Sequence, residues 1–136
     1  MRYSEFKALR GKAINKFPMF FAFNTEQLEE GKATLGVKEN KELLDIGAGG
    51  FIRRIDAGAF HALLQGGNEQ IKDFIKIKAQ FKDALRYELE NHEYCITYDV
   101  TDTLEALGLE LNKLTKDQLQ TLAEAKQEYL EGCNNG

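Results

Sequence analysis

The segment from Leu43 to Asp56, LLDIGAGGFIRRID, constrains the fold of this chain more than any other. Two short apolar runs flank three glycines that fall within four residues. Glycine adopts the positive φ angles that other residues avoid, so this pattern is typical of a β-hairpin turn. We therefore expect a strand over residues 42–46, a turn over 47–50 and a second strand over 51–55.

The composition is that of an ordinary globular domain, with 43% hydrophobic, 29% charged and 10% aromatic residues. A chain of 136 residues can bury a hydrophobic core without metal or disulfides. We expect a single domain over residues 1–136, with 132–136 as a flexible tail. No apolar run approaches the ~20 residues that span a bilayer, and the first residues lack the apolar stretch of a signal peptide. The expected protein is cytoplasmic, does not contact membranes, and has free thiols at Cys95 and Cys133.

Patterns typical of helices and strands cover the first part of the chain. Apolar residues at three- and four-residue intervals predict a helix over 3–16, which Pro18 ends. Residues 17–23 are apolar on both alternating faces, which predicts a strand covered on both sides. Asn24 has the spacing of a helix cap, and the helix that it begins is expected to end at Gly36.

The second part of the chain is predicted to be helical. The expected helices span 56–64, ended by Gly66 and Gly67, then 68–91, then 102–108, and a last helix that begins at a Thr115–Gln118 capping box. Residues 92–98 fit either a strand or a turn. The predicted fold is α+β: a small three-stranded sheet, with the glycine-turn hairpin, covered by about six helices.

The glycine turn is a candidate ligand site. The amides near Gly47, Gly49 and Gly50 could form an anion-binding nest, and Arg53 or Arg54 could supply positive charge to a phosphate-bearing ligand. Both the dinucleotide-binding fingerprint and the P-loop pattern are absent. The alternative, which we favour, is a hairpin whose turn simply requires positive φ angles.

Charge is distributed unevenly along a chain of net charge −4. Residues 1–17 carry five basic and one acidic side chains, and a basic first helix suggests nucleic-acid binding through Lys7, Arg10 and Lys12. The alternative is that this helix packs near the acidic half of the chain.

Residues 87–136 carry three basic and eleven acidic side chains. Residues 104–109, followed by another predicted helix, resemble a helix-turn-helix, but the acidic excess argues against DNA reading by this segment, because phosphate contacts need Lys and Arg. The acidic surface is instead a candidate for binding a protein partner, with Glu105, Glu110 and Asp117 as its residues.

The sequence has few residues that could bind a metal or catalyse a reaction. The chain has two histidines and two cysteines, of which only His92 and Cys95 have close spacing, whereas zinc takes three or four ligands. No serine-hydrolase elbow, HExxH motif or nucleophile–base set occurs. We therefore expect no metal, no cofactor, no catalytic residue and no enzymatic activity.

Three strings together resemble a known group of proteins: FAFNTEQLEEG over 21–31, IGAGGFIR over 46–53 and NHEYCIT over 91–97. The group consists of small uncharacterised proteins of phages and mobile elements from gut bacteria, and the resemblance covers roughly residues 3–110. It implies a genomic setting in which small accessory proteins often bind and modulate host proteins. Together with the absence of catalytic motifs and the acidic composition, it predicts a non-enzymatic accessory protein that binds a host or phage protein, as an inhibitor or modulator. It assigns no functional residue. A homodimer is also compatible with the apolar strand over 17–23.

Overall fold

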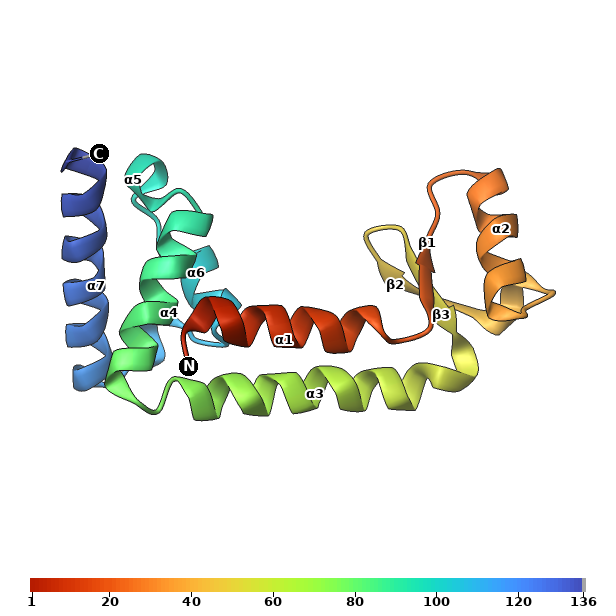
Figure 1. The fold of residues 1–136 in the computed structure, drawn as a ribbon, viewed down its shortest axis with the longest axis horizontal. Coiled ribbons are helices and arrows are strands. Elements are labelled where there is room, and N and C mark those ends of the chain that lie inside the picture. Colours follow the sequence, from red (N-terminus) through yellow and green to blue (C-terminus); the bar gives the residue numbers. More distant parts are fainter. Residues whose placement is uncertain (136) are drawn as a thin grey trace. The chain divides into compact units, whose positions relative to one another are not determined.

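The computed structural model describes residues 1–135. Within these residues the chain forms seven α-helices and a three-stranded antiparallel sheet, which confirms the α+β class (Figure 1). In chain order the elements are α1 (Tyr3–Asn15), β1 (Met19–Phe21), α2 (Thr25–Leu35), β2 (Leu43–Gly47), β3 (Gly50–Arg53), α3 (Ala57–Phe74), α4 (Lys78–Asn91), α5 (Tyr94–Thr97), α6 (Thr101–Ala106) and α7 (Lys116–Asn135). Short 3₁₀ helices span Asn40–Glu42, Arg54–Asp56 and Leu111–Lys113.

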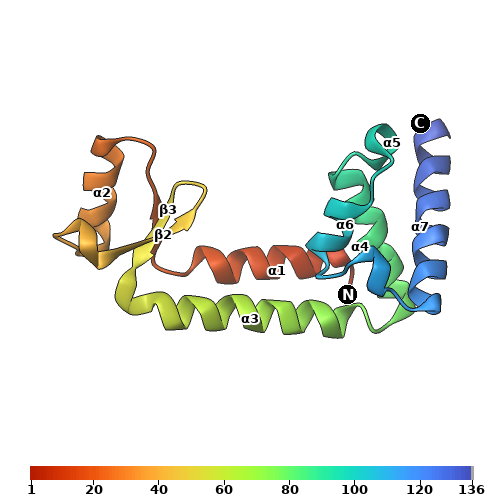
Figure 2. The same cartoon turned by 180° about the vertical axis from the view of Figure 1, so that it is seen from behind.

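The chain packs as two units, each with its own buried residues. One unit, here called the sheet unit, is Arg10–Gly66 and contains the three strands and α2. The other, the helical unit, is made of Met1–Leu9 and Gly67–Gly136. Both units can be followed from the opposite side in Figure 2. Among the described residues, no helix combines the length and the apolar composition that a membrane crossing requires.

The predicted hairpin is confirmed as β2 and β3. The sheet order is β1-β3-β2, so β3 is central, and its Ile52 is fully buried. Ile52 lies opposite Met19 on one side and Leu44 on the other. The turn has positive φ angles at Gly47 (91°), Ala48 (52°) and Gly49 (81°), a conformation that favours glycine.

Helix α2 begins and ends where local side-chain chemistry predicts. The Asn24 side chain accepts a hydrogen bond from the Gln27 backbone at 2.8 Å, and the Gln27 side chain accepts one from Phe23, also at 2.8 Å. Gly36 ends the helix in the left-handed region, with φ 71°. These contacts are local in sequence, which is why the sequence pattern was sufficient to predict them.

The strand predicted over residues 17–23 is shorter and less covered than expected. Only Met19–Phe21 pairs with β3. Side chains alternate along a strand, and α2 packs against β1 through the contact of Phe20 with Gly31. The opposite side carries Phe21, which is 57% exposed, so the prediction of a strand covered on both sides is wrong.

The helix boundaries predicted between residues 56 and 91 are also wrong. Helix α3 continues through Gly66 and Gly67, and the chain instead breaks between Phe74 and Lys78, where Ile77 is extended. Glycine weakens a helix but does not end it unless the backbone leaves the helical region, and Gly66 keeps an ordinary negative φ. The break lies between Phe74 and Phe81, which both enter one core, so burial decides where the helix stops.

The core of the helical unit is built around α4. Its Ala84, Leu85 and Leu89 are fully buried, and α7 packs along it. The complete core cluster is Tyr3, Phe74, Phe81, Ala84, Leu85, Leu89, Tyr94, Leu104, Leu107, Leu122 and Ala125.

Near the end of the chain, the structure settles one segment that the sequence left open and confirms the start of the last helix. Residues 92–98 form neither a strand nor a simple turn, but the four-residue α5 between two left-handed residues, Glu93 (φ 53°) and Tyr98 (φ 54°). The capping box at Thr115 and Gln118 is confirmed, with hydrogen bonds of 2.9 and 3.1 Å. Helix α7 then continues to Asn135, across part of the tail predicted over 132–136, and Gly136 lies outside the described residues.

Candidate functional site

The glycine turn is held by the chain's own groups. The Gly47 amide donates to Asp45 Oδ1 at 2.8 Å, so its hydrogen bond is already made with a carboxylate of the chain itself. Gly49 lies against the exposed ring of Phe23, and its φ of 81° is a conformation that favours glycine. Gly50 is buried in the ladder opposite Phe21. The turn therefore has a structural role that accounts for its glycines.

The structure does not bring the two arginines to the glycine turn. Arg53 is the last residue of β3 and Arg54 follows it, at the opposite end of the strand from the turn, and Arg53 Nε donates to Asp56 Oδ2 at 2.7 Å. Arg54 donates to two backbone carbonyls, from Nε to Lys41 at 3.1 Å and from Nη2 to Leu43 at 3.0 Å. The predicted ligand site is thus divided into two separate places.

The arginines instead line a surface hollow of about 470 Å³, here called the arginine hollow. Its residues are Gly36, Val37, Lys41, Glu42, Arg53, Arg54 and Ile55. They come from the end of α2, the 3₁₀ turn before β2 and the end of β3. Val37 is buried, whereas Ile55 is 83% exposed, so the hollow has an apolar floor and an apolar residue at the surface.

Three cationic side chains and one carboxylate line the arginine hollow. Its single carboxylate, Glu42 Oε2, accepts backbone hydrogen bonds from Glu39 at 2.9 Å and Lys38 at 3.1 Å. These two bonds, the one from Glu39 first, lower the pKa of Glu42 below its usual value. Lys41 Nζ lies 3.1 Å from Glu39 Oε2, and Arg53 is paired with Asp56, so two of the three cations already have acidic partners. Arg54 donates to backbone carbonyls instead, and its charge is what the hollow offers to an anionic group.

Sequence reasoning found Arg53 and Arg54 but missed Lys41, Val37 and Ile55. Ile55 directly follows the two arginines, and an apolar residue next to paired cations was a signal that could have been used. Lys41 and Val37 could not be found in this way, because only the path of the chain between α2 and β2 brings them to the arginines.

The predicted acidic surface is partly assembled. Glu105 and Glu110 line the same small hollow of about 270 Å³, beside α6. Glu110 is already paired with Lys113, with 2.9 Å between Oε2 and Nζ. Asp117 lines a different hollow, so the three residues do not form one surface site.

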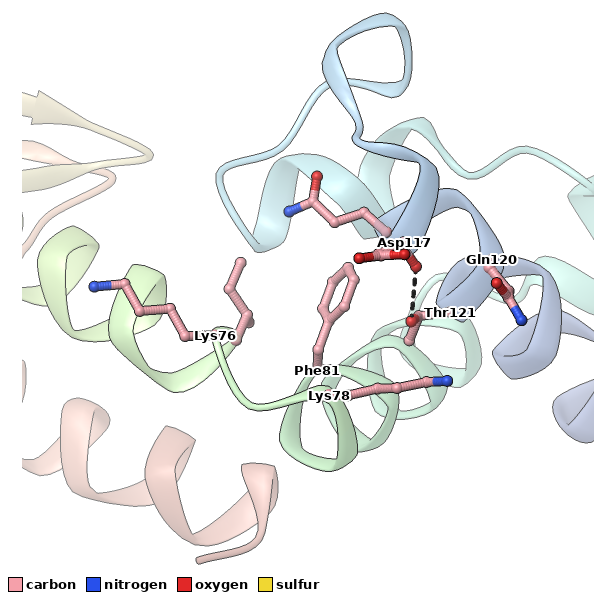
Figure 3. A pocket seen from close by; sticks show the side chains of 8 residues that line it. Lys76, Lys78, Phe81, Asp117, Gln120 and Thr121 are labelled. Atoms are coloured by element: carbon pink, nitrogen blue, oxygen red, sulfur yellow. Dashed lines mark hydrogen bonds between the residues drawn. The ribbon is translucent and has the colours of Figure 1, made fainter.

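Figure 3 shows that second hollow, which has a volume of about 450 Å³ and lies between the α3–α4 break and the first turns of α7. The buried Phe81 ring lies among its polar side chains, and the Thr121 hydroxyl donates to the Asp117 carbonyl at 2.9 Å (Figure 3). Lys76 pairs with Asp73 at 2.9 Å, and Lys78 pairs with Glu124 at 3.4 Å. Each cation therefore has an acidic neighbour, which leaves little net attraction for a charged ligand.

The basic residues of α1 have different surroundings. Lys7 is engaged inside the helical unit, with Nζ 2.7 Å from Glu88 Oε1 and 5.1 Å from the centre of the Tyr87 ring. Arg10 is half-buried and Lys12 is exposed. Helical spacing places Arg10 one turn from Lys7 and Lys12 off that face. Nucleic-acid binding through these three residues stays a prediction.

Within residues 1–135, no three side chains of His, Cys, Asp and Glu come together in a group that could hold a metal ion. His92, which follows the last residue of α4, has its Nε2 3.5 Å from Glu88 Oε2.

A comparison with protein-family models matches residues 2–131 to a family of unknown function, DUF7659. No curated protein and no solved structure matches the chain.

Proposed function

The chain belongs to DUF7659, and we propose that it is a non-enzymatic accessory protein that acts by binding another protein through the arginine hollow. The resemblance to phage and mobile-element proteins supports a host or phage protein as the partner, with inhibition or modulation as the result. The partner segment that fits the hollow carries an apolar side chain next to carboxylates.

The main observation that supports this proposal is the exposure of Ile55 beside the two arginines. Ile55 is 83% exposed, and burial of such a side chain stabilises a complex by roughly 1.5–3 kcal/mol. Arginine is enriched at protein interfaces, where its planar group pairs with carboxylates. Arg54 is already fixed by two backbone carbonyls, so little side-chain entropy is lost when a partner binds.

Substitution of Ile55 by aspartate tests the proposal. Tagged protein is used for affinity capture from host lysate, at low and moderate salt and after nuclease treatment. We expect a stoichiometric protein partner that wild type retains and Ile55→Asp loses. The matched control is Ile96→Asp, because Ile96 is 72% exposed but lies in the helical unit.

Two results would contradict the proposal. Equal retention by both variants would show that the hollow is not the binding face. The absence of any stoichiometric partner would argue against a protein-binding function. Circular dichroism of each variant verifies that the fold is intact before capture is compared.

A small ligand that carries a phosphate is the second candidate function. Three cationic side chains, Lys41, Arg53 and Arg54, line one hollow whose volume of about 470 Å³ is within the range of small-molecule sites. We expect a nucleoside triphosphate or inorganic phosphate to raise the melting temperature of wild type, and Arg53→Ala to abolish that rise. Arg53 is the better test position, because Arg54 also supports the backbone near Leu43.

A further inference from the structure

Two buried polar atoms at the end of α4 face each other without a hydrogen bond. Glu88 Oε2 and His92 Nε2 lie 3.5 Å apart, and both are buried and lack a hydrogen-bond partner among residues 1–135. The Glu88 side chain is 1% exposed. A polar atom that gives up water on folding and gains no partner lowers stability, so such atoms are rare in folded proteins. Packing alone therefore does not explain this pair.

Lys7 satisfies only one of the two carboxylate oxygens of Glu88. Its Nζ lies 2.7 Å from Oε1, whereas Oε2 faces the His92 ring. The Lys7 ammonium also lies 5.9 and 5.1 Å from the centres of the Tyr3 and Tyr87 rings, which hold it on its own side of the carboxylate. One oxygen of Glu88 is thus available to a second cation.

The other elements that pack against α4 bring no further charged contact to this pair among residues 1–135. From α6, the Thr103 hydroxyl donates to the Glu88 backbone carbonyl at 3.3 Å, and from α5, Tyr94 is buried in the core. The carboxylates of α7 pair with lysines in the first two turns of α4: Glu124 with Lys78 and Glu128 with Lys82. Other charged side chains that neighbour these residues along the chain are exposed: Glu5, Arg86, Glu90, Glu93, Asp102 and Glu105.

The position of His92 favours a positive charge on its ring. Helix α4 ends at His92, where the last carbonyls of a helix carry partial negative charge. A neutral ring can donate to Oε2 through one nitrogen, but only the protonated ring adds a positive charge beside that carboxylate. The helix end and Glu88 thus act in the same direction, against the like charge of Lys7 at the other oxygen.

We propose that His92 is a pH-responsive latch, whose protonated ring pairs with Glu88 Oε2 and fixes the end of α4. Histidine takes up its proton as the pH falls through about 6.5. The latch is closed below that pH and open above it, so the stability that it contributes is present in mildly acidic solution and is lost as the pH rises. Both residues belong to the helical unit, so the latch acts separately from the arginine hollow.

The latch lies next to a segment with an unusual backbone. Glu93 has φ 53°, in the left-handed region that residues other than glycine rarely adopt, and Tyr98 at the other end of α5 has φ 54°. A residue in this conformation persists only where its surroundings hold it. The closed latch fixes the residue immediately before Glu93, so we expect residues 92–98 to be better ordered when His92 is charged.

Thermal unfolding at about pH 8 and about pH 5.5, on either side of the histidine range, tests the proposal. In His92→Gln the side chain can still donate a hydrogen bond to Glu88 but cannot carry a charge. We expect wild type and His92→Gln to melt at nearly the same temperature at the higher pH, and wild type to melt about 3 °C higher at the lower pH. The matched control is His61→Gln, at an exposed histidine of the sheet unit, which should keep the pH profile of wild type.

A double-mutant cycle assigns the effect to the pair. In a Glu88→Gln background, His92→Gln should lose its pH-dependent effect on the melting temperature. An effect of His92→Gln that is the same at both pH values would overturn the latch, because an uncharged hydrogen bond would then account for the contact. A pH-dependent effect that survives in Glu88→Gln would contradict Glu88 as the partner.

Hydrogen exchange of the wild-type chain tests the latch without any substitution. Protection factors, which remove the intrinsic pH dependence of exchange, are measured for residues 92–98 at the same two pH values. We expect several-fold greater protection at the lower pH, with no such change at the buried Ile52 of the sheet unit. Equal protection of residues 92–98 at both pH values would overturn the proposal.

Discussion

Lys7 and Glu88 form an ion pair that joins the first helix of the chain to the last turn of α4. Lys7 Nζ lies 2.7 Å from Glu88 Oε1, and the two side chains are 40% and 1% exposed. A carboxylate without water needs a charged partner, so Lys7 neutralises a charge inside the helical unit. A residue that the sequence suggested for nucleic-acid contact thus has an internal role.

Lys7→Met is expected to destabilise the protein by about 2–3 kcal/mol, because it leaves the buried Glu88 carboxylate without its cation. The partial exposure of Lys7 keeps the expected loss below that of a fully buried pair. Urea unfolding measures the change. The double variant Lys7→Met/Glu88→Leu should recover most of the lost stability, and Lys12→Met, at an exposed lysine of α1, should lie within about 0.5 kcal/mol of wild type. A Lys7→Met protein as stable as wild type would refute this account of the pair.

Two glycines inside helices should respond to alanine with opposite signs. Gly66→Ala in α3 has open space around the new methyl group, so we expect stabilisation by up to about 1 kcal/mol from helix propensity. Gly31→Ala in α2 would place a Cβ 2.1 Å from the Phe20 ring, so we expect destabilisation despite the same gain in propensity. Thermal unfolding of the two variants compares them directly. Stabilisation by both would show that Phe20 does not pack on Gly31.

Two substitutions in the hairpin turn, Gly49→Ala and Ala48→Gly, should also differ in their effect on stability. Gly49→Ala forces alanine to φ 81° and toward the Phe23 ring, and should destabilise the protein by about 1–2 kcal/mol. Ala48→Gly relieves a positive φ of 52° and should be neutral or slightly stabilising. Equilibrium unfolding monitored by circular dichroism provides the comparison. If Gly49→Ala were neutral, the turn would not need the left-handed conformation at that residue.

The Glu42 carboxylate should make stability depend on pH in the acidic range. Its backbone hydrogen bonds lower its folded-state pKa below 4.5, so its contribution is fully present above pH 4.5 and is lost as the pH falls through the folded pKa. Melting temperatures of wild type and Glu42→Gln, measured between neutral pH and about pH 3, should therefore converge as the pH falls. Glu30→Gln, at an exposed position on α2, is the matched control and should keep the pH profile of wild type.

Local interactions account for most of what the sequence predicted correctly. The caps at Asn24, Gly36 and Thr115 and the turn at Gly47–Gly50 each involve residues within a few positions of one another. Their geometry follows from hydrogen bonding and allowed φ angles that the residues carry with them. The order of these elements was sufficient to predict an α+β fold with a small sheet.

The candidate site was less predictable, because its parts come together only in three dimensions. Arg53 and Arg54 were visible as charges, but their separation from the glycine turn follows from the direction of β3, and their neighbours Val37 and Lys41 come from another part of the chain.

The sequence by itself determined the hairpin, the helix caps and the class of the fold, since short-range sterics and hydrogen bonds act on neighbouring residues. Tertiary structure decided which glycines end a helix, where α3 stops and which charges are buried. Gly31 and Gly66 look alike in the sequence, yet one receives the ring of Phe20 and the other faces open space. Packing and desolvation depend on residues that are distant along the chain, and these terms become defined only once the fold has formed.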